Sequence, residues 1–232
     1  MTADAVVDRT APPGPASTTL QRRLRAVPGP RPILDREREQ ALTDRQRDLL
    51  DQLGSRFDDG FADLTMAELA AQLNCSLRTL YELARSRDEL VLTVVDRNLW
   101  RVGRLAMDAI APDMEPLAAL RAYLRAATIA VATTTEPFAR DLAAMPEAER
   151  CSKDHSDYLV AVTKSLLDLA WERGQIDETD TAAVARVIAG LGRDFSRPEV
   201  MPTLPGSPKQ AADDVVDIVL RGLERPRRDG RR

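Results

Sequence analysis

Residues 65–90, TMAELAAQLNCSLRTLYELARSRDEL, contain two short helical patterns separated by a turn of only a few residues. Thr65 and Glu68 have the spacing of a capping box, in which each side chain bonds the other residue's backbone N–H and so begins a helix. The apolar residues that follow recur at helical spacing. Asn74 tolerates the left-handed backbone conformation that ends a helix, and Ser76 is a favoured N-cap for the next one.

This spacing favours a helix-turn-helix, because two short helices joined by so tight a turn cannot run antiparallel. Such a motif presents its second helix to the major groove of DNA. Leu80 and Leu83 share the face of that helix expected to be buried. The opposite face carries side chains suited to guanine edges, phosphates and thymine methyl groups. The residues that we expect at DNA are Thr65, Ser76, Leu77, Arg78, Thr79, Tyr81, Glu82, Arg85 and Arg87.

Different roles are expected within this set. Arg78 is expected to read a base, whereas Tyr81 and Arg87 are expected to position the duplex. A surface ion pair between Arg78 and the acid four residues later is the alternative for that side chain. Ser86 and Glu89 have the spacing of a further capping box and begin the next helix, so Arg87 falls in its first turn.

The run from Leu69 to Leu90 resembles the DNA-binding signature of the TetR family of bacterial transcriptional regulators. The matching positions are Leu69-Ala70, Ser76, Thr79-Leu80-Tyr81 and Leu90. Asn74, Cys75, Ala84 and Arg87 depart from the family's usual Gly, Val, aromatic residue and Lys. The missing ring at Ala84 leaves a volume that Phe57, Phe61 or Leu83 has to fill. The specific resemblance extends over residues 42–99.

The resemblance implies an all-α protein with an N-terminal three-helix helix-turn-helix domain, joined by a long helix to a C-terminal helical bundle for dimerisation and ligand binding. It implies a homodimer held by a four-helix interface, a palindromic double-stranded DNA operator, and a repressor released by an unknown small-molecule effector. Two recognition helices in successive major grooves lie about 34 Å apart. A small rotation of the long helices therefore moves one of them out of register.

Composition agrees with this fold class and does not exclude a DNA-binding function. The 232 residues include only 4% aromatic residues, and abundant Ala and Leu favour helices. The net charge of −4 is compatible with DNA binding, because phosphate contact depends on where the cations cluster. Two cysteines without metal-ligand spacing predict a reduced chain. We expect a cytoplasmic protein, since no membrane span or signal-peptide core is visible.

Four segments are expected along the chain. Residues 1–40, rich in Pro, Ala and Arg, predict a disordered basic arm, either a solvated tail or a segment that reaches a neighbouring groove. Residues 41–99 are expected to form the DNA-binding domain and residues 100–226 the ligand-binding and dimerisation domain. Residues 227–232 are expected to be a tail.

The remaining helices are predicted from caps, prolines and apolar spacing over residues 43–57, 86–112, 116–131, 137–144, 146–173, 181–191 and 208–223. About twenty-five residues of the helix predicted over 86–112, at 1.5 Å each, give a length of about 37 Å, which is enough to belong to both domains. Gly103 is its weak point. The last two helices show more apolar surface than one chain covers and are expected to pair between chains.

Candidate ligand-binding residues in the second domain are Met107, Tyr123, Phe138, His155, Tyr158 and Trp171. Core packing explains each as well, and His155 is interpreted as a hydrogen-bonded structural residue or a ligand anchor. No phosphate loop, nucleophile elbow or metal-ligand spacing is present, so no catalytic residue, cofactor or metal is expected. Two alternatives stay open: a helical dimeric interaction protein without DNA binding, and a DNA-binding regulator without an effector.

Overall fold

The computed structural model describes residues 19–128 and 135–225, and within these ranges the secondary structure is helical apart from one bridge between Ile176 and Glu224. This confirms the predicted all-α fold class. The α-helices are α1 (Thr19–Arg25), α2 (Arg36–Ala41), α3 (Asp44–Arg56), α4 (Met66–Gln72), α5 (Leu77–Leu83), α6 (Arg87–Asp108), α7 (Pro116–Ala127), α9 (Glu136–Ala143), α10 (Pro146–Glu172), α11 (Thr181–Phe195) and α12 (Pro208–Leu223), with short 3₁₀ turns η1 (Phe57–Asp59) and η2 (Met201–Thr203). None of the described helices is long and apolar enough to cross a membrane.

The helix starts follow the predicted caps with one exception. The capping box predicted at Thr65 is formed, and Thr43 and Gln46 form another at the start of α3. Ser86 caps α6 by accepting a hydrogen bond from the Glu89 N–H, but the Glu89 carboxylate accepts from the N–H of Arg85, at 2.8 Å. The predicted third capping box is therefore wrong in its second half, because the carboxylate reaches one residue further back.

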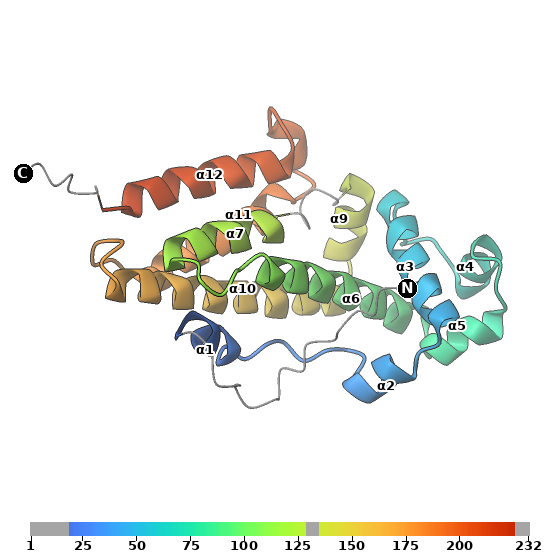
Figure 1. Ribbon diagram of the computed structural model, residues 1–232. Coiled ribbons are helices and arrows are strands. Elements are labelled where there is room, and N and C mark those ends of the chain that lie inside the picture. Colours follow the sequence, from blue (N-terminus) through green and yellow to red (C-terminus); the bar gives the residue numbers. More distant parts are fainter. Residues whose placement is uncertain (1–18, 129–134, 226–232) are drawn as a thin grey trace, which may run out of the picture.

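One end of the molecule is a small core formed by α3, α4, α5 and the first half of α6 (Figure 1). We call it the DNA-binding core, after the function that the sequence predicts for this part of the chain. Phe57 and Phe61 pack with ring centroids 5.2 Å apart. Ala84 is buried in the same cluster, together with Leu83. Phe57, Phe61 and Leu83, which the sequence analysis proposed to fill the volume left by the missing ring, are thus all buried in the cluster that contains Ala84.

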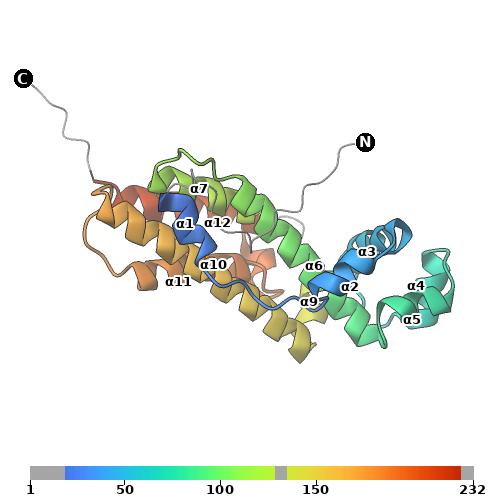
Figure 2. The same ribbon diagram turned by 60° about the horizontal axis from the view of Figure 1, so that its bottom comes forward.

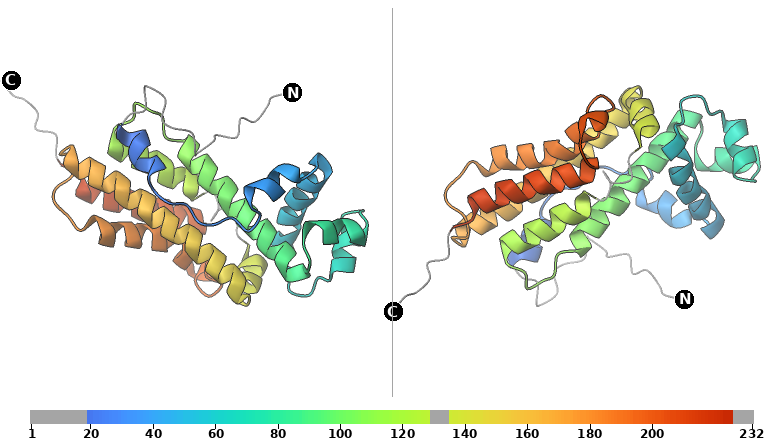
Figure 3. Two further views of the ribbon diagram at one scale, coloured as in Figure 1. Left: turned by 90° about the horizontal axis from the view of Figure 1, so that it is seen from below. Right: turned by 90° about the horizontal axis from the view of Figure 1, so that it is seen from above.

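The other end is a bundle in which α10 packs against α6, α7 and α11, and α12 packs on α11 (Figure 3). Its core includes fully buried Leu120, Leu166 and Leu167, and Tyr123 is 2% exposed. Ala106 near the end of α6 belongs to this core, whereas Leu90 near its start belongs to the DNA-binding core. The long helix thus joins the two cores, as predicted.

The prediction of a disordered arm over residues 1–40 is wrong for residues 19–40, and residues 1–18 lie outside the described residues. Helix α1 lies against α10, and the segment after it returns along the bundle to α2 (Figure 2). Leu20 and Leu24 are 1% and 4% exposed in the bundle core, and Leu34 is buried in the DNA-binding core. These few leucines, hidden among Pro and Arg in the sequence, supply the apolar surface that orders the segment.

The division at residue 99 does not separate the two cores cleanly. The second segment contributes Phe138, Leu142 and Met145, in and just after α9, to the surroundings of the DNA-binding core. The arm contributes α1 to the bundle core. Both contributions bring together residues that are far apart in the sequence, so the local sequence pattern could not indicate them. The predicted tail over residues 227–232 lies outside the described residues.

Candidate nucleic-acid interface

Helix α5 has the two faces that its sequence predicts. Leu80 and Leu83 are buried at 0% and 2% exposure. On the opposite face, Leu77 is 41% and Tyr81 51% exposed, and the Arg78 side chain is 89% exposed. A large apolar residue, an aromatic residue and a cation left uncovered together on a short helix are available for contact with a partner.

The turn before α5 fixes its direction. Asn74 has a positive φ of 48°, the conformation that its residue type was predicted to tolerate. The Cys75 N–H donates to the Ala70 carbonyl at 3.0 Å, which closes the end of α4. The Ser76 hydroxyl then accepts from the Thr79 N–H at 3.0 Å and lies 2.7 Å from the Thr79 hydroxyl. The Ser76 hydroxyl therefore caps α5, and Ser76 remains exposed beside it.

An open groove of about 600 Å³ runs between the start of α4 and the outer face of α5. Five of the nine residues predicted at DNA line it, namely Thr65, Leu77, Tyr81, Arg85 and Arg87. The other four, Ser76, Arg78, Thr79 and Glu82, lie on α5 or its cap but do not line the groove. The fold thus brings the predicted residues to one side of the domain.

Arg78 makes the surface ion pair that was its alternative role, with Nε 3.2 Å from Glu82 Oε1. An exposed pair of this kind contributes little free energy, because water and salt screen it. Its guanidinium group can therefore exchange Glu82 for a base edge at small cost.

Arg87 is placed differently from the prediction. Its Nε donates to the Leu64 carbonyl at 2.8 Å, its Nη2 donates to the carbonyls of Phe61 and Ala62, and its Nη1 pairs with Asp88. Only 28% of the side chain is exposed. Arg87 therefore holds the loop before α4 and does not present a free guanidinium group to a phosphate.

Asp141 in α9 also binds the loop before α4, through the backbone N–H groups of that loop. Its Oδ2 accepts hydrogen bonds from the N–H groups of Phe61, at 2.6 Å, and Ala62, at 2.8 Å. Burial raises the pKa of this carboxyl group, but these two bonds and the neighbouring Arg140 outweigh burial and hold the pKa below its ordinary value. A side chain at Gly60, where φ is +96°, would place Cβ 3.0 Å from the carboxylate. Sequence reasoning missed Asp141, because nothing in the pattern of α9 indicates a partner so far along the chain.

The six candidate ligand-binding residues do not line one cavity. Met107, Tyr123 and Tyr158 pack in or against the bundle core. Phe138 packs instead against Phe61 in the DNA-binding part, with ring centroids 5.9 Å apart. Trp171 is 49% exposed at the end of α10. His155 faces Asp96, with Nε2 and Oδ1 2.9 Å apart.

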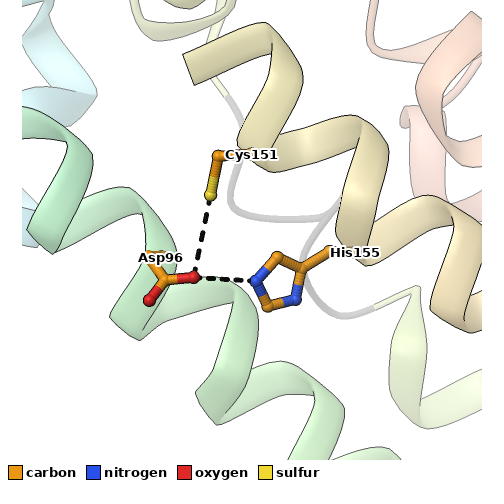
Figure 4. A group of neighbouring side chains, drawn as sticks. All are labelled: Asp96, Cys151 and His155. Carbon is orange, nitrogen blue, oxygen red and sulfur yellow. Dashed lines mark hydrogen bonds and ion pairs between the residues drawn. The ribbon is translucent and has the colours of Figure 1, made fainter. Parts of the chain in front are cut away.

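Asp96, Cys151 and His155 form a cluster between α6 and α10 (Figure 4). The sequence analysis found no metal-ligand spacing, yet the ligand atoms of these three residues all lie within 4.8 Å of one another. The one sequence signal was that Cys151 and His155 share a helical face. Asp96 comes from another helix, so only the tertiary structure completes the group.

An all-helical chain with a helix-turn-helix at one end and a helical bundle at the other defines a class of fold seen in bacterial regulators. PfmR from Thermus thermophilus, a TetR-family transcriptional regulator, is 21% identical; the match covers 76% of this chain and 99% of PfmR, with a TM-score of 0.56. A TetR transcription regulator from Haloarcula marismortui is 15% identical over 79% of this chain and 100% of its own, with a TM-score of 0.65. The ketosteroid transcriptional regulator KstR2 of Mycobacterium tuberculosis is 19% identical over 80% of this chain and 97% of its own, with a TM-score of 0.54.

The chain therefore has the TetR-family fold. No protein-family model and no curated protein matches its sequence.

Proposed function

We propose that this protein is a DNA-binding transcriptional regulator whose recognition helix is α5. The observation that carries the proposal is the uncovered outer face of α5, where Leu77, Arg78 and Tyr81 stand exposed beside the groove. These side chains offer an apolar contact for thymine methyl groups, a guanidinium group for guanine, and a hydroxyl group for phosphate.

The regulator acts as a homodimer on a palindromic operator. Val187 on α11 and Ile218 on α12 are 57% and 68% exposed, and these two helices pack side by side. A second copy that covers both residues removes this apolar surface from water. Two-fold symmetry then presents two copies of α5, which reach successive major grooves when they lie about 34 Å apart.

The finer proposal is a repressor released from DNA by a small molecule. It is supported by α6, which contributes to both cores and whose first turn carries the Arg87 contacts to the loop before α4. A ligand that displaces the far end of α6 would shift this loop, because a packed helix moves as a unit.

A regulator without a small-molecule effector is the second candidate. It is favoured by the scatter of the six candidate ligand residues, which belong to two different cores or to the surface. Thermal unfolding in the presence of a metabolite panel separates the two, since an effector that binds the folded state raises the unfolding temperature.

Selection of bound fragments from a random DNA pool tests the proposal directly. We expect two-fold symmetric sites and an affinity that falls steeply with salt concentration. In the Arg78→Ala variant, preference at one base position of each half-site should relax by about 1–3 kcal/mol. Glu82→Ala is the matched control, because it removes the ion pair but retains the arginine. Failure of the dimer to bind any duplex would favour the alternative of a helical interaction protein.

A further inference from the structure

The cluster of Asp96, Cys151 and His155 lies where the DNA-binding part meets the bundle, with Asp96 buried and the other two residues partly buried. The side chains of Asp96 and His155 are 5% and 10% exposed. Oδ1 of Asp96 lies 2.9 Å from His155 Nε2 and 3.7 Å from Cys151 Sγ. Figure 4 shows the Cys151 and His155 side chains pointing from α10 toward Asp96 on α6.

Asp96 is a buried carboxylate whose side-chain partners are His155 and Cys151. A buried carboxylate is costly unless it is paired, and within the described part of the chain the structure shows Asp96 no ion pair with Lys or Arg. Its other oxygen, Oδ2, accepts one hydrogen bond from the Ile33 N–H at 2.9 Å. The Cys151 thiol points its S–H toward the same carboxylate, with Sγ 3.7 Å from Oδ1.

We propose that Asp96, Cys151 and His155 bind a divalent transition metal ion of the Zn²⁺ class. A carboxylate, a thiolate and an imidazole are the donor types that Zn²⁺ takes, and three protein ligands leave a fourth position open for water. In a tetrahedral site with bonds of about 2.0–2.3 Å, such donor atoms stand roughly 3.3–3.5 Å apart. The separations of 2.9 and 3.7 Å from Asp96 Oδ1 lie on either side of these values, and all three ligand atoms lie within 4.8 Å of one another.

Binding of the metal ion replaces bonds within the cluster by bonds from the three side chains to the ion. The S–H bond of Cys151 breaks, its proton passes to solvent, and the sulfur forms a bond to the metal. The imidazole and carboxylate exchange their mutual hydrogen bond for bonds to the same ion. The two negative ligands then surround a dication, whose charge they balance.

The position of the site gives the metal a second effect. Asp96 is on α6 and also accepts from Ile33 in the segment that returns from α1, whereas Cys151 and His155 are on α10. An ion bound by all three ties α6 to α10 next to the DNA-binding core. If the protein binds DNA as proposed above, we expect zinc-loaded and metal-free protein to differ in DNA affinity by at least about fivefold.

Titration of the metal-free full-length protein with Co²⁺ tests the site without reference to DNA. Co²⁺ occupies Zn²⁺ sites and gives visible absorption bands, with a thiolate charge-transfer band in the near ultraviolet when cysteine is a ligand. We expect one Co²⁺ per chain, displaced by Zn²⁺. The charge-transfer band should disappear in Cys151→Ser, and binding should weaken by more than about tenfold in Asp96→Asn and His155→Gln.

Cys75→Ser is the matched control, since Cys75 is the second free cysteine in the described residues and lies in the DNA-binding part. It should retain the wild-type spectrum. Circular dichroism of each metal-free variant checks that the helices form, and the wild-type titration decides the question even if one variant does not fold. Absence of a thiolate band in the wild type, or its persistence in Cys151→Ser, overturns the proposal.

DNA affinity measured with and without Zn²⁺ then tests the coupling. A wild-type response that is lost in Cys151→Ser supports it. An unchanged DNA affinity in protein that binds Co²⁺ refutes the coupling and leaves the site standing. Protein that binds Co²⁺ but no DNA in either state refutes the proposed function and leaves the site standing.

Discussion

The loop between η1 and α4 is held at two points by single residues from distant helices. Arg87 in α6 donates to carbonyls of the loop, and Asp141 in α9 accepts from its N–H groups. The loop precedes Thr65, the N-cap of α4, so these two side chains set the position of the helix-turn-helix relative to the rest of the protein.

Replacing Asp141 by Ala should lower the free energy of unfolding by about 1–3 kcal/mol, because the buried N–H of Phe61 loses its acceptor. The carboxyl pKa is depressed in the folded state, so the charged form stabilises the fold above the ordinary value of 3.8. This contribution disappears as the pH falls through the lower folded pKa. Chemical denaturation of wild type and Asp141→Asn should therefore show a constant difference at neutral pH that narrows below pH 3.8. A difference that widens in acid would contradict the assignment.

Replacing Arg87 by Ala separates a phosphate contact from a structural role. Because its guanidinium group is bonded to three loop carbonyls, we expect a lower unfolding temperature and weaker DNA binding with an unchanged salt slope. A direct phosphate contact would instead reduce the slope by about one. Arg85→Ala is a suitable control for the loss of an exposed arginine, since Arg85 is exposed and lines the same groove as Arg87.

At the scale of elements, α6 and the segment from α1 to α2 each connect the two ends of the molecule. Helix α6 passes from the DNA-binding core into the bundle core, and the α1 segment passes from the bundle back to α2. Both connections depend on buried side chains, so both can be tested by their effect on stability.

Gly103→Ala should raise the free energy of unfolding by up to about 1 kcal/mol, because alanine favours a helix interior over glycine. A Cβ at Gly103 would meet no atom within 4 Å, so the change carries no steric cost. Gly54→Ala in α3 is the contrast, since there a Cβ would stand 3.1 Å from Asn98 Nδ2. If α6 works as a stiff rod, coupling between effector and DNA is retained in Gly103→Ala. Loss of coupling with both binding affinities intact would identify Gly103 as a hinge.

The double variant Leu20→Ala/Leu24→Ala should destabilise the bundle by several kcal/mol, at about 2–5 kcal/mol for each fully buried leucine. Both leucines lie in the bundle core, whereas Arg22 and Arg25 in the same helix are exposed. Arg25→Ala should change stability by no more than about 0.5 kcal/mol. Thermal unfolding measures both, and equal stabilities would show that α1 does not depend on these contacts.

At the scale of the whole molecule, the uncovered apolar residues of α11 and α12 determine how two copies meet. Not all of the apolar surface that the sequence predicts for pairing is uncovered, because Val216 and Leu220 in α12 are buried within the chain at 6% and 0% exposure. Ile218 and Val187 are the exposed residues. The apolar residues of α11 and α12 are therefore divided between the chain's own core and the surface proposed to contact the second copy.

Ile218→Glu, or Val187→Glu, should convert the dimer to a monomer, because each places a charge at the centre of an apolar interface. Sedimentation at micromolar concentration measures the change, and DNA affinity should fall with it. Leu105→Glu serves as control, since Leu105 is 45% exposed on α6 rather than on α11 or α12. A wild type that sediments as a monomer would exclude the proposed interface.

The sequence by itself determined the elements that depend on neighbouring residues. The caps at Thr43, Thr65 and Ser76 and the left-handed Asn74 are local backbone chemistry, so their positions were predicted correctly. The buried and exposed faces of α5 followed from helical periodicity for the same reason. Much of the candidate DNA interface could therefore be predicted before the fold was known.

Only the tertiary structure decided the contacts between residues that are far apart in the chain. Three such contacts depend on how the helices pack. Helix α1 packs against α10, Asp141 accepts hydrogen bonds from the loop, and Asp96 lies beside Cys151 and His155. Periodicity gives the face of a helix but not its partner, because the burial of apolar surface is non-directional. The role of Arg87 changed for this reason: its charge was visible in the sequence, but the carbonyls that bind it come from a loop placed there by packing.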